Sequence, residues 1–398
     1  MSTFITIFKK EFTDTIRDRR TLFVMIIFPL LLFPLLITAV ITLQTSQMRK
    51  AQEKVLRLGL VLDGNAQSFR QELISIKGFR IAEGISRDSA QVMIERDSLD
   101  AVIVFAPDFD RRVESRQAGT VHLYFKFSDE YNISQRRLRE LITAYERTLI
   151  ARRFEQLNLD KSIVDAVSID EHDVTPLKEK IGKTIGGFIP YLFVIFCFMG
   201  SMYPAIDLAS GEKERGTIET LLTAPVSRFQ ILLGKFAVVV LTGLLSASVS
   251  MLGLYAAVRQ NAEVPPQVMD TVLGILNAGS ILLVLSLLLP LAVFFAAILL
   301  SLSFFAKSYK EAQSLISPLT IVVLLPVAIG MIPGIELNAS TALIPVLNVS
   351  LATKEIIAGT IQPLILAEVY LSLTILAAVS LLACARWFER EETIFRGA

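Results

Sequence analysis

Six long apolar runs, separated by polar stretches, dominate the sequence. Each run is about 20 or more residues long, which is the length that an α-helix needs to cross the hydrocarbon core of a bilayer. The pattern therefore predicts an α-helical polytopic membrane protein with six transmembrane helices. The predicted spans are Thr21–Leu43, Thr184–Pro204, Ile231–Ala257, Ile275–Phe305, Ala312–Ile332 and Pro363–Ala385.

The segment between the first two spans, residues 44–183, follows other patterns. Val55–Leu62 and Val121–Phe127 alternate between apolar and polar residues, which is typical of half-buried strands. Ala101–Phe105 is wholly apolar and suits a central strand. Ile133–Leu157 carries an apolar stripe at helical spacing. We therefore predict an inserted α/β domain.

Lys and Arg residues are distributed unevenly around the six runs. They are frequent in residues 1–20, in the loops after the second and fourth spans and in the tail, residues 386–398. The short loops on the other side hold Arg259 and Lys354. Short segments rich in Lys and Arg stay on the cytoplasmic side of a membrane. We therefore expect a multi-pass protein of the cell membrane, inner or plasma, with both termini in the cytoplasm and an extracytoplasmic α/β domain.

The first 20 residues are amphipathic. Ile5, Phe8, Phe12 and Ile16 share one face of a predicted helix, and basic residues occupy the other. Such a helix lies in the membrane interface, in contact with lipids. The simpler alternative is that the basic residues only anchor the topology. The residues assigned to the interfacial helix are Phe8, Phe12, Arg17, Arg19 and Arg20.

Composition narrows the choice of function. The chain has 398 residues, of which 53% are hydrophobic and 19% are charged, and its formal net charge is +1. Without a long basic run it is not expected to bind nucleic acid. Cys197 and Cys384 both lie in apolar runs, and His122 and His172 are far apart, so we predict no disulfide framework and no metal site.

Residues 184–385 hold the second to sixth spans and, at about 208–228, a charged cytoplasmic loop. Thr217 can cap a short helix, and Pro225 can end it. Ile218, Leu221 and Leu222 would then share one face. Exposed apolar side chains next to dense mixed charge favour a surface that docks on a partner. The alternative is an ordinary solvated loop.

Three sequence motifs resemble those of the type-2 ABC exporter permeases. The first extends from Gly211 to Leu222, reads GEKERGTIETLL, and is followed by Ala224–Arg228 and by Gly234-Lys235. The second is Lys10-Glu11-Phe12, with Arg17–Leu22 and a first span that contains two prolines, Pro29 and Pro34. The third is Pro345–Asn348, with Lys354 and Gly359 before the last span. The resemblance covers the layout of the whole chain.

This resemblance implies a transport subunit that is not an enzyme. Six spans would form half of a transporter, completed by a homodimer or heterodimer with a second permease. The loop at 208–228 would be the coupling helix that docks on an ATP-binding cassette subunit, which would bind ATP and Mg, and this chain would bind no cofactor. The likeness is greatest to permeases of sodium efflux. The expected coupling residues are Glu212, Glu214, Arg215, Gly216, Thr217, Ile218, Glu219, Leu221 and Leu222.

Other functional motifs are incomplete. Gly182-Lys183-Thr184 resembles the end of a phosphate-binding loop, but Leu177 stands where that loop needs glycine. Glu391 to Arg396 matches the EExxxR pattern of an intramembrane protease family, but both histidines of the chain lie in residues 44–183. A membrane-anchored sensor or scaffold stays open as an alternative, and a protease is disfavoured. No ionisable residue lies mid-span, so the substrate-binding residues are not identified.

Overall fold

The computed structural model divides the chain into two compact units. The first consists of Met1–Val40 and Asp173–Ala398, and the second of Ile41–His172. We describe each unit by itself. The structure describes residues 3–53, 55–63, 65–76, 78–125, 133–158, 188–217, 220, 223, 225–260, 269, 273–274, 277–332 and 334–388.

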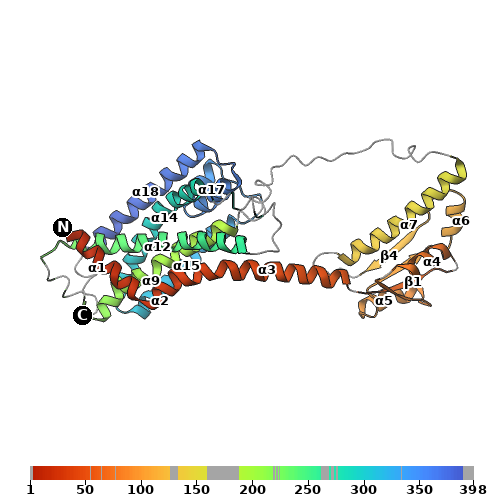
Figure 1. The fold of residues 1–398 in the computed structure, drawn as a ribbon, viewed down its shortest axis with the longest axis horizontal. Helices are drawn as coiled ribbons and strands as arrows, with labels where there is room; N and C mark the ends of the chain where they lie inside the picture. The colour runs from red at the N-terminus through yellow and green to blue at the C-terminus, as the bar shows by residue number, and fades with distance from the viewer. Residues whose placement is uncertain are drawn as a thin grey trace. The chain divides into compact units, whose positions relative to one another are not determined.

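The first unit is a helical bundle (Figure 1). Within the described residues, six helices are long and apolar enough to cross a membrane, in agreement with the predicted number. The second is longer than predicted and continues to Glu214. The tail after Phe388 lies outside the described residues. The six helices are Arg19–Leu43, Phe188–Glu214, Arg228–Gln260, Ala278–Phe305, Tyr309–Ile329 and Pro363–Phe388.

The centre of the bundle is formed by α9 (Phe188–Ile206), α12 (Arg228–Gln260) and α14 (Ala278–Phe305). Where α9 and α12 cross, a Cβ on Gly200 would lie 2.4 Å from the Cβ of Ser246, and a Cβ on Gly243 would lie 2.2 Å from the Oγ of Ser201. Small residues allow helices in a membrane to approach this closely. Two outer helices, α15 (Tyr309–Ile329) and α18 (Pro363–Phe388), expose more of their apolar surface than these three central helices do.

The first span is not one regular helix. The amphipathic α1 (Thr3–Arg17) is followed by the short α2 (Arg19–Leu22), a π-helical turn η1 (Phe23–Ile27) and then α3 (Phe28–Glu53). Phe33 of α3 is buried among the bundle's aromatic rings, with its ring centroid 6.3 Å from that of Phe196.

Two short helices, α16 (Ala339–Ala342) and α17 (Leu347–Ala358), connect α15 with α18. In Figure 1, α17 lies at the end of the bundle away from α1. Val346 precedes α17 with a φ of +69°, and the Leu347 amide donates to the Pro345 carbonyl at 2.8 Å. This three-residue γ-turn is strained for a β-branched residue, and it lies in the predicted Pro345–Asn348 motif.

The second unit contains a four-stranded sheet in the order β2-β1-β3-β4. The strands β2 (Phe79–Ala82), β1 (Leu56–Val61) and β3 (Ala101–Phe105) are parallel, and β4 (Val121–Phe125) is antiparallel to β3. Four helices accompany the sheet (Figure 1). They are α4 (Gln67–Ser75), α5 (Arg87–Glu95), α6 (Phe109–Glu114) and α7 (Ile133–Leu157).

Both faces of the sheet are covered. Leu58 and Ile103 pack with Phe69 of α4 and Leu138 of α7 on one face, and Val61, Val102 and Val104 pack with Ala90 and Ile94 of α5 on the other. The central position of β3 and the half-exposed β4 follow the sequence patterns. The strand β1, expected to be half-buried, is instead buried on both faces because helices cover each of them. The second unit is thus a sheet with helices on both faces.

Candidate functional site

The predicted coupling segment begins as an extension of the second span. The helix α9 continues through a π-helical turn, η3 (Asp207–Gly211), into α10 (Glu212–Glu214). The helix then ends at Gly216, whose φ of +69° is a left-handed conformation that glycine adopts at low cost. The first part of 208–228 is therefore a helical continuation of the second span and not a separate loop. Four predicted coupling residues, Ile218, Glu219, Leu221 and Leu222, lie outside the described residues.

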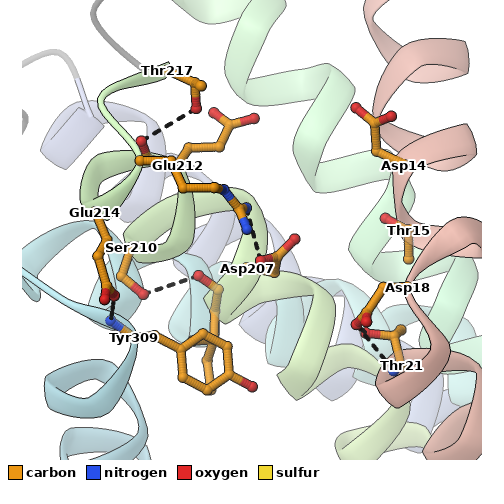
Figure 2. A network of polar contacts seen from close by, with 12 residues as sticks. Asp14, Thr15, Asp18, Thr21, Asp207, Ser210, Glu212, Glu214, Thr217 and Tyr309 are labelled. Atoms are coloured by element: carbon orange, nitrogen blue, oxygen red, sulfur yellow. Dashed lines mark hydrogen bonds and ion pairs between the residues drawn. The ribbon is translucent and has the colours of Figure 1, made fainter.

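The described coupling residues are tied to their own bundle. Arg215 Nη2 lies 2.8 Å from Asp207 Oδ1, at the start of the π-helical segment. The backbone amide of Tyr309, at the start of α15, donates to Glu214 Oε2 at 2.9 Å. Lys213 donates to the Phe304 carbonyl at the end of α14. Figure 2 shows the Glu214–Tyr309 and Thr217–Glu212 contacts.

Glu212 belongs to a closed ring of four alternating charges. Lys235 Nζ of α12 lies 2.7 Å from Glu212 Oε2 and 3.0 Å from Glu11 Oε1 of α1. Lys10 Nζ closes the ring, at 3.2 Å from both Glu212 Oε1 and Glu11 Oε1. We call Lys10, Glu11, Glu212 and Lys235 the ion ring. It joins α1, α10 and α12.

Most of the ion ring is buried. The side chain of Lys235 is 0% exposed, that of Glu11 is 1% exposed and that of Glu212 is 7% exposed, whereas Lys10 is half exposed. Desolvating charges is costly, and only close opposite charges offset the cost. Burial would lower the pKa of the Lys10 ammonium, but the carboxylates of Glu212 and Glu11 outweigh it and raise that pKa above its ordinary value.

The face of α1 that packs on the bundle differs from the apolar face that is expected to contact lipid. Ile7, Glu11 and Thr15 are its buried residues, whereas Ile5 and Ile16 are exposed. Phe8 and Phe12 are partly buried and stack with ring centroids 5.7 Å apart. A stripe chosen by hydrophobicity alone leaves out Glu11, because the two lysines that make its burial tolerable are not visible in the helix pattern. Of the predicted interfacial residues, Arg17, Arg19 and Arg20 are exposed.

A small notch fixes α1 against α12. A Cβ on Gly234 would lie 2.6 Å from the Cγ2 of Ile7, so only glycine lets Ile7 pack at this depth. The next residue on α12 is Lys235, and one turn further along α1 is Glu11. An apolar contact and a charged contact therefore adjoin one another and define the position of α1 along α12.

Beside the ion ring lies a cavity of about 880 Å³ between the α1–α2 segment and the end of the second span. Asp18 shapes one wall, because its carboxylate accepts from the amides of Arg20 and Thr21 at 3.2 and 3.1 Å and so caps α2. Figure 2 shows Asp14 and Asp18 on one side and Asp207 and Glu212 on the other. The lining residues are Lys10, Asp14, Arg17, Asp18, Arg20, Thr21, Tyr203, Asp207, Glu212, Arg215, Thr217, Thr220 and Tyr309.

Comparison with known families gives the class of the protein. A family model described as an ABC-2 family transporter protein matches residues 19–386. The chain belongs to the ABC-2 transporter family. The ABC transporter permease protein NatB of Bacillus subtilis (strain 168) is 26% identical to it over 399 aligned residues, which cover 98% of each chain. The ABC-2 chain is therefore a multi-pass membrane protein of a permease family.

Glu11 and Lys235 were missed as functional candidates. Both occur in the quoted motifs, in Lys10-Glu11-Phe12 and in Gly234-Lys235, but nothing in either motif states that they meet. The available signal was the lysine itself, which lies four residues inside the third predicted span and needs an acidic partner if it is buried. The sequence does not show which of the many acidic residues of the ABC-2 chain that partner is.

The other candidate sites remain without support in the ABC-2 chain. Among the described residues, no group of three or more His, Cys, Asp or Glu side chains could hold a metal ion. His122 is exposed on β4, and His172 lies outside the described residues. The segment Gly182-Lys183-Thr184 and the protease-like Glu391 and Glu392 lie outside them too.

Proposed function

We propose that this chain is the permease subunit of an ATP-driven exporter and works with a separate ATP-binding cassette subunit. Membership of the ABC-2 family supports this function. The observation that carries it is the position of the signature segment, which extends from the second span and is linked by side chains to α1, α12, α14 and α15. A force applied to this segment would reach most of the bundle.

In this proposal the end of the bundle that holds α1 and α10 faces the cytoplasm, as do both termini. The α/β unit inserted between the first two spans is then the extracytoplasmic domain. The ATP-binding subunit would hold ATP and Mg and would contact the segment from Glu212 to Arg228. The coupling residues outside the described structure, such as Leu221 and Leu222, would supply apolar contacts to that partner.

A second permease, identical or different, would complete the transport pathway. Sodium is the proposed substrate, and its support is the resemblance of the motifs to permeases of sodium efflux. Residue chemistry adds nothing to that assignment, since the six predicted spans hold no ionisable residue near their midpoints.

The proposal is tested by co-expressing the chain with an ATP-binding cassette subunit. We expect the two proteins to co-purify, ATP hydrolysis to depend on the ATP-binding subunit, and vesicles that contain both to move radioactive sodium when ATP is supplied. Hydrolysis of ATP by the purified permease alone would contradict the proposal.

The structure also improves the choice of variant for this test. Charge reversal at Glu214 and Arg215 would uncouple the subunits, but it would also break the internal contacts with Tyr309 and Asp207. Thr220 is exposed on the same segment. Thr220→Trp adds bulk there and should abolish co-purification while the permease still folds, with Thr220→Ser as the control. If Thr220→Trp binds the subunit as the unaltered chain does, the docking assignment is wrong.

A further inference from the structure

Lys235 is a lysine with no exposed surface, and it is held by carboxylates from two other elements of the bundle. We propose that Lys235 is a positioning residue that makes α1 and the ends of the second and third spans move as one body. The inference rests on the proposed function, because the movement begins when the ATP-binding subunit displaces the coupling segment.

The ion ring can act as a rigid joint because each of its four side chains contacts two side chains of opposite charge. Glu212 gives one carboxylate oxygen to Lys235 and the other to Lys10, and Glu11 Oε1 is shared by both lysines. A shift of Glu212 along the axis of its helix would lengthen contacts to α1 and to α12 together. A bond between only two helices would not couple the two contacts in this way, whereas a closed ring among three elements does.

Stability alone is a poor explanation for the ion ring. Apolar residues of similar volume often hold a buried position as well as a salt bridge does, because they avoid the cost of desolvation. The apolar contact of Ile7 with Gly234 already attaches α1 to α12. What the charges add is a defined register, since alternating charges fit in one arrangement. Glu11 Oε2 and Glu212 Oε2 form no hydrogen bond within the described structure, although Lys235 Nζ lies 2.7 Å from Glu212 Oε2, so the burial of the two carboxylates is not fully compensated.

Three successive residues of α10 contact different helices of the bundle. Glu212 reaches α1 and α12 through the ion ring, Lys213 reaches the end of α14, and Glu214 reaches the start of α15. Removal of the ion ring should therefore release α1 and α12 from the coupling segment, while the contacts of Lys213 and Glu214 stay in place. The predicted defect is partial and directional, which separates it from general loosening of the fold.

The test measures the distance between spin labels on α1 and on the coupling segment. Thr13 and Thr223 are exposed and suit labelling, whereas the native Cys197 and Cys384 are buried. The variant Glu11→Gln/Glu212→Gln/Lys235→Met removes the buried charges together and so leaves none of them unpaired. The matched control is Arg70→Met/Glu83→Gln, which removes a charge pair from the second unit.

In the complex with the ATP-binding subunit, trapping with ATP and vanadate should leave the Thr13–Thr223 label distance unchanged in the unaltered chain and in the control. In the triple variant, trapping should shift it. The permease alone gives a second readout, because loss of the joint should broaden its distribution of label distances. If the triple variant keeps the unaltered distance and the unaltered width, the inference is refuted.

The outcomes separate the two proposals. Failure of the unaltered chain to bind an ATP-binding subunit would refute the proposed function. The width of the label-distance distribution in the permease alone would still test whether the ion ring holds α1 to the coupling segment. If the triple variant does not fold, Lys235→Arg replaces it, since this variant keeps the charge but not the ammonium geometry. A broadened distance distribution in Lys235→Arg then supports the inference, and an unaltered one overturns it.

Discussion

One charge pair in each unit has the same closest distance between its charged atoms, but the two pairs lie in opposite surroundings. In the bundle, Lys235 and Glu212 lie 2.7 Å apart and are almost fully buried. In the second unit, Arg70 and Glu83 also lie 2.7 Å apart, but their side chains are 40% and 47% exposed. The distance between two charges therefore does not show what a pair contributes. Exposure to water determines the contribution of a pair to stability, because water and salt screen an exposed pair, whereas a buried pair has lost its hydration.

The comparison also indicates which unit tolerates substitutions that alter charge. The sheet of the second unit is held by apolar cores on both faces, and its charges lie at the surface. The bundle has its own apolar core, but the contact between α1, α10 and α12 also includes three charged side chains that are almost fully buried. Substitutions that alter charge should therefore act on the bundle far more than on the second unit.

The largest effect is expected from Lys235→Met. This change leaves Glu11 and Glu212 buried without their main counter-charge, and breaking one partner of a buried pair costs about 3–5 kcal/mol. The measurement is the free energy of unfolding of the purified chain in detergent, by denaturant titration. Adding Glu11→Gln and Glu212→Gln should recover most of the loss. A single variant as stable as the unaltered chain would show that Lys235 is not buried with a charge.

The next effect concerns the crossing of α9 and α12. In Gly243→Ala the new methyl group would meet the Ser201 hydroxyl and the Cys197 carbonyl, at 2.2 and 2.8 Å. Overpacking of this kind costs about 1–3 kcal/mol. The control is Gly274→Ala, because a Cβ at Gly274 meets no atom within 4 Å. Comparison of the two melting temperatures checks this, and equal values would mean that the crossing is looser than the structure shows.

Sequence reasoning predicted those features that depend on one segment at a time. Six apolar runs gave six helices, and the wholly apolar Ala101–Phe105 forms the central strand β3. The helix at Ile133–Leu157 is α7, with the predicted bounds. Each of these follows from periodicity and length within a single stretch of chain.

The features that sequence reasoning did not predict depend on contacts between segments that are distant in the sequence. The ion ring joins residues as far apart as Lys10 and Lys235, and no local pattern pairs them. The face of α1 that packs on the bundle includes Ile7 and Glu11 because Gly234 and Lys235 of α12 lie opposite them, and the pattern of α1 alone does not show this. The signature segment was identified by its residues, yet its first part proved to be a continuation of the second span, held there by contacts with α14 and α15.

A smaller effect is expected at the Asp18 cap. Burial would raise the pKa of Asp18, but hydrogen bonds from Thr21 and Arg20 outweigh it and lower the pKa below the ordinary value of 3.8. Asp18→Ala should cost about 1 kcal/mol, as loss of a helix N-cap usually does, and Asp18→Asn should cost less because it keeps an acceptor.

The pH dependence at Asp18 follows from the lowered pKa. The unfolded chain takes up a proton at Asp18 at a higher pH than the folded chain does, so the stabilisation is present above pH 3.8 and is lost as pH falls through the folded pKa. Melting temperatures of the unaltered chain and of Asp18→Asn, measured between neutral pH and about pH 3, should converge at the acid end. Parallel curves would mean that Asp18 does not cap α2.

The smallest effect is expected at the exposed pair in the second unit, and it completes the comparison. The hydrogen bond from Arg70 lowers the pKa of Glu83, so the pair exists at neutral pH. Both side chains nevertheless remain hydrated, and exposed pairs contribute little. Arg70→Met should leave the melting temperature unchanged, and any small loss should vanish in high salt because salt screens exposed charges. Salt should not reduce the loss in Lys235→Met, because ions cannot reach a side chain with no exposed surface. If the two variants respond alike to salt, burial does not distinguish the ion ring from a surface pair, and the comparison gives no support for Lys235 as a positioning residue.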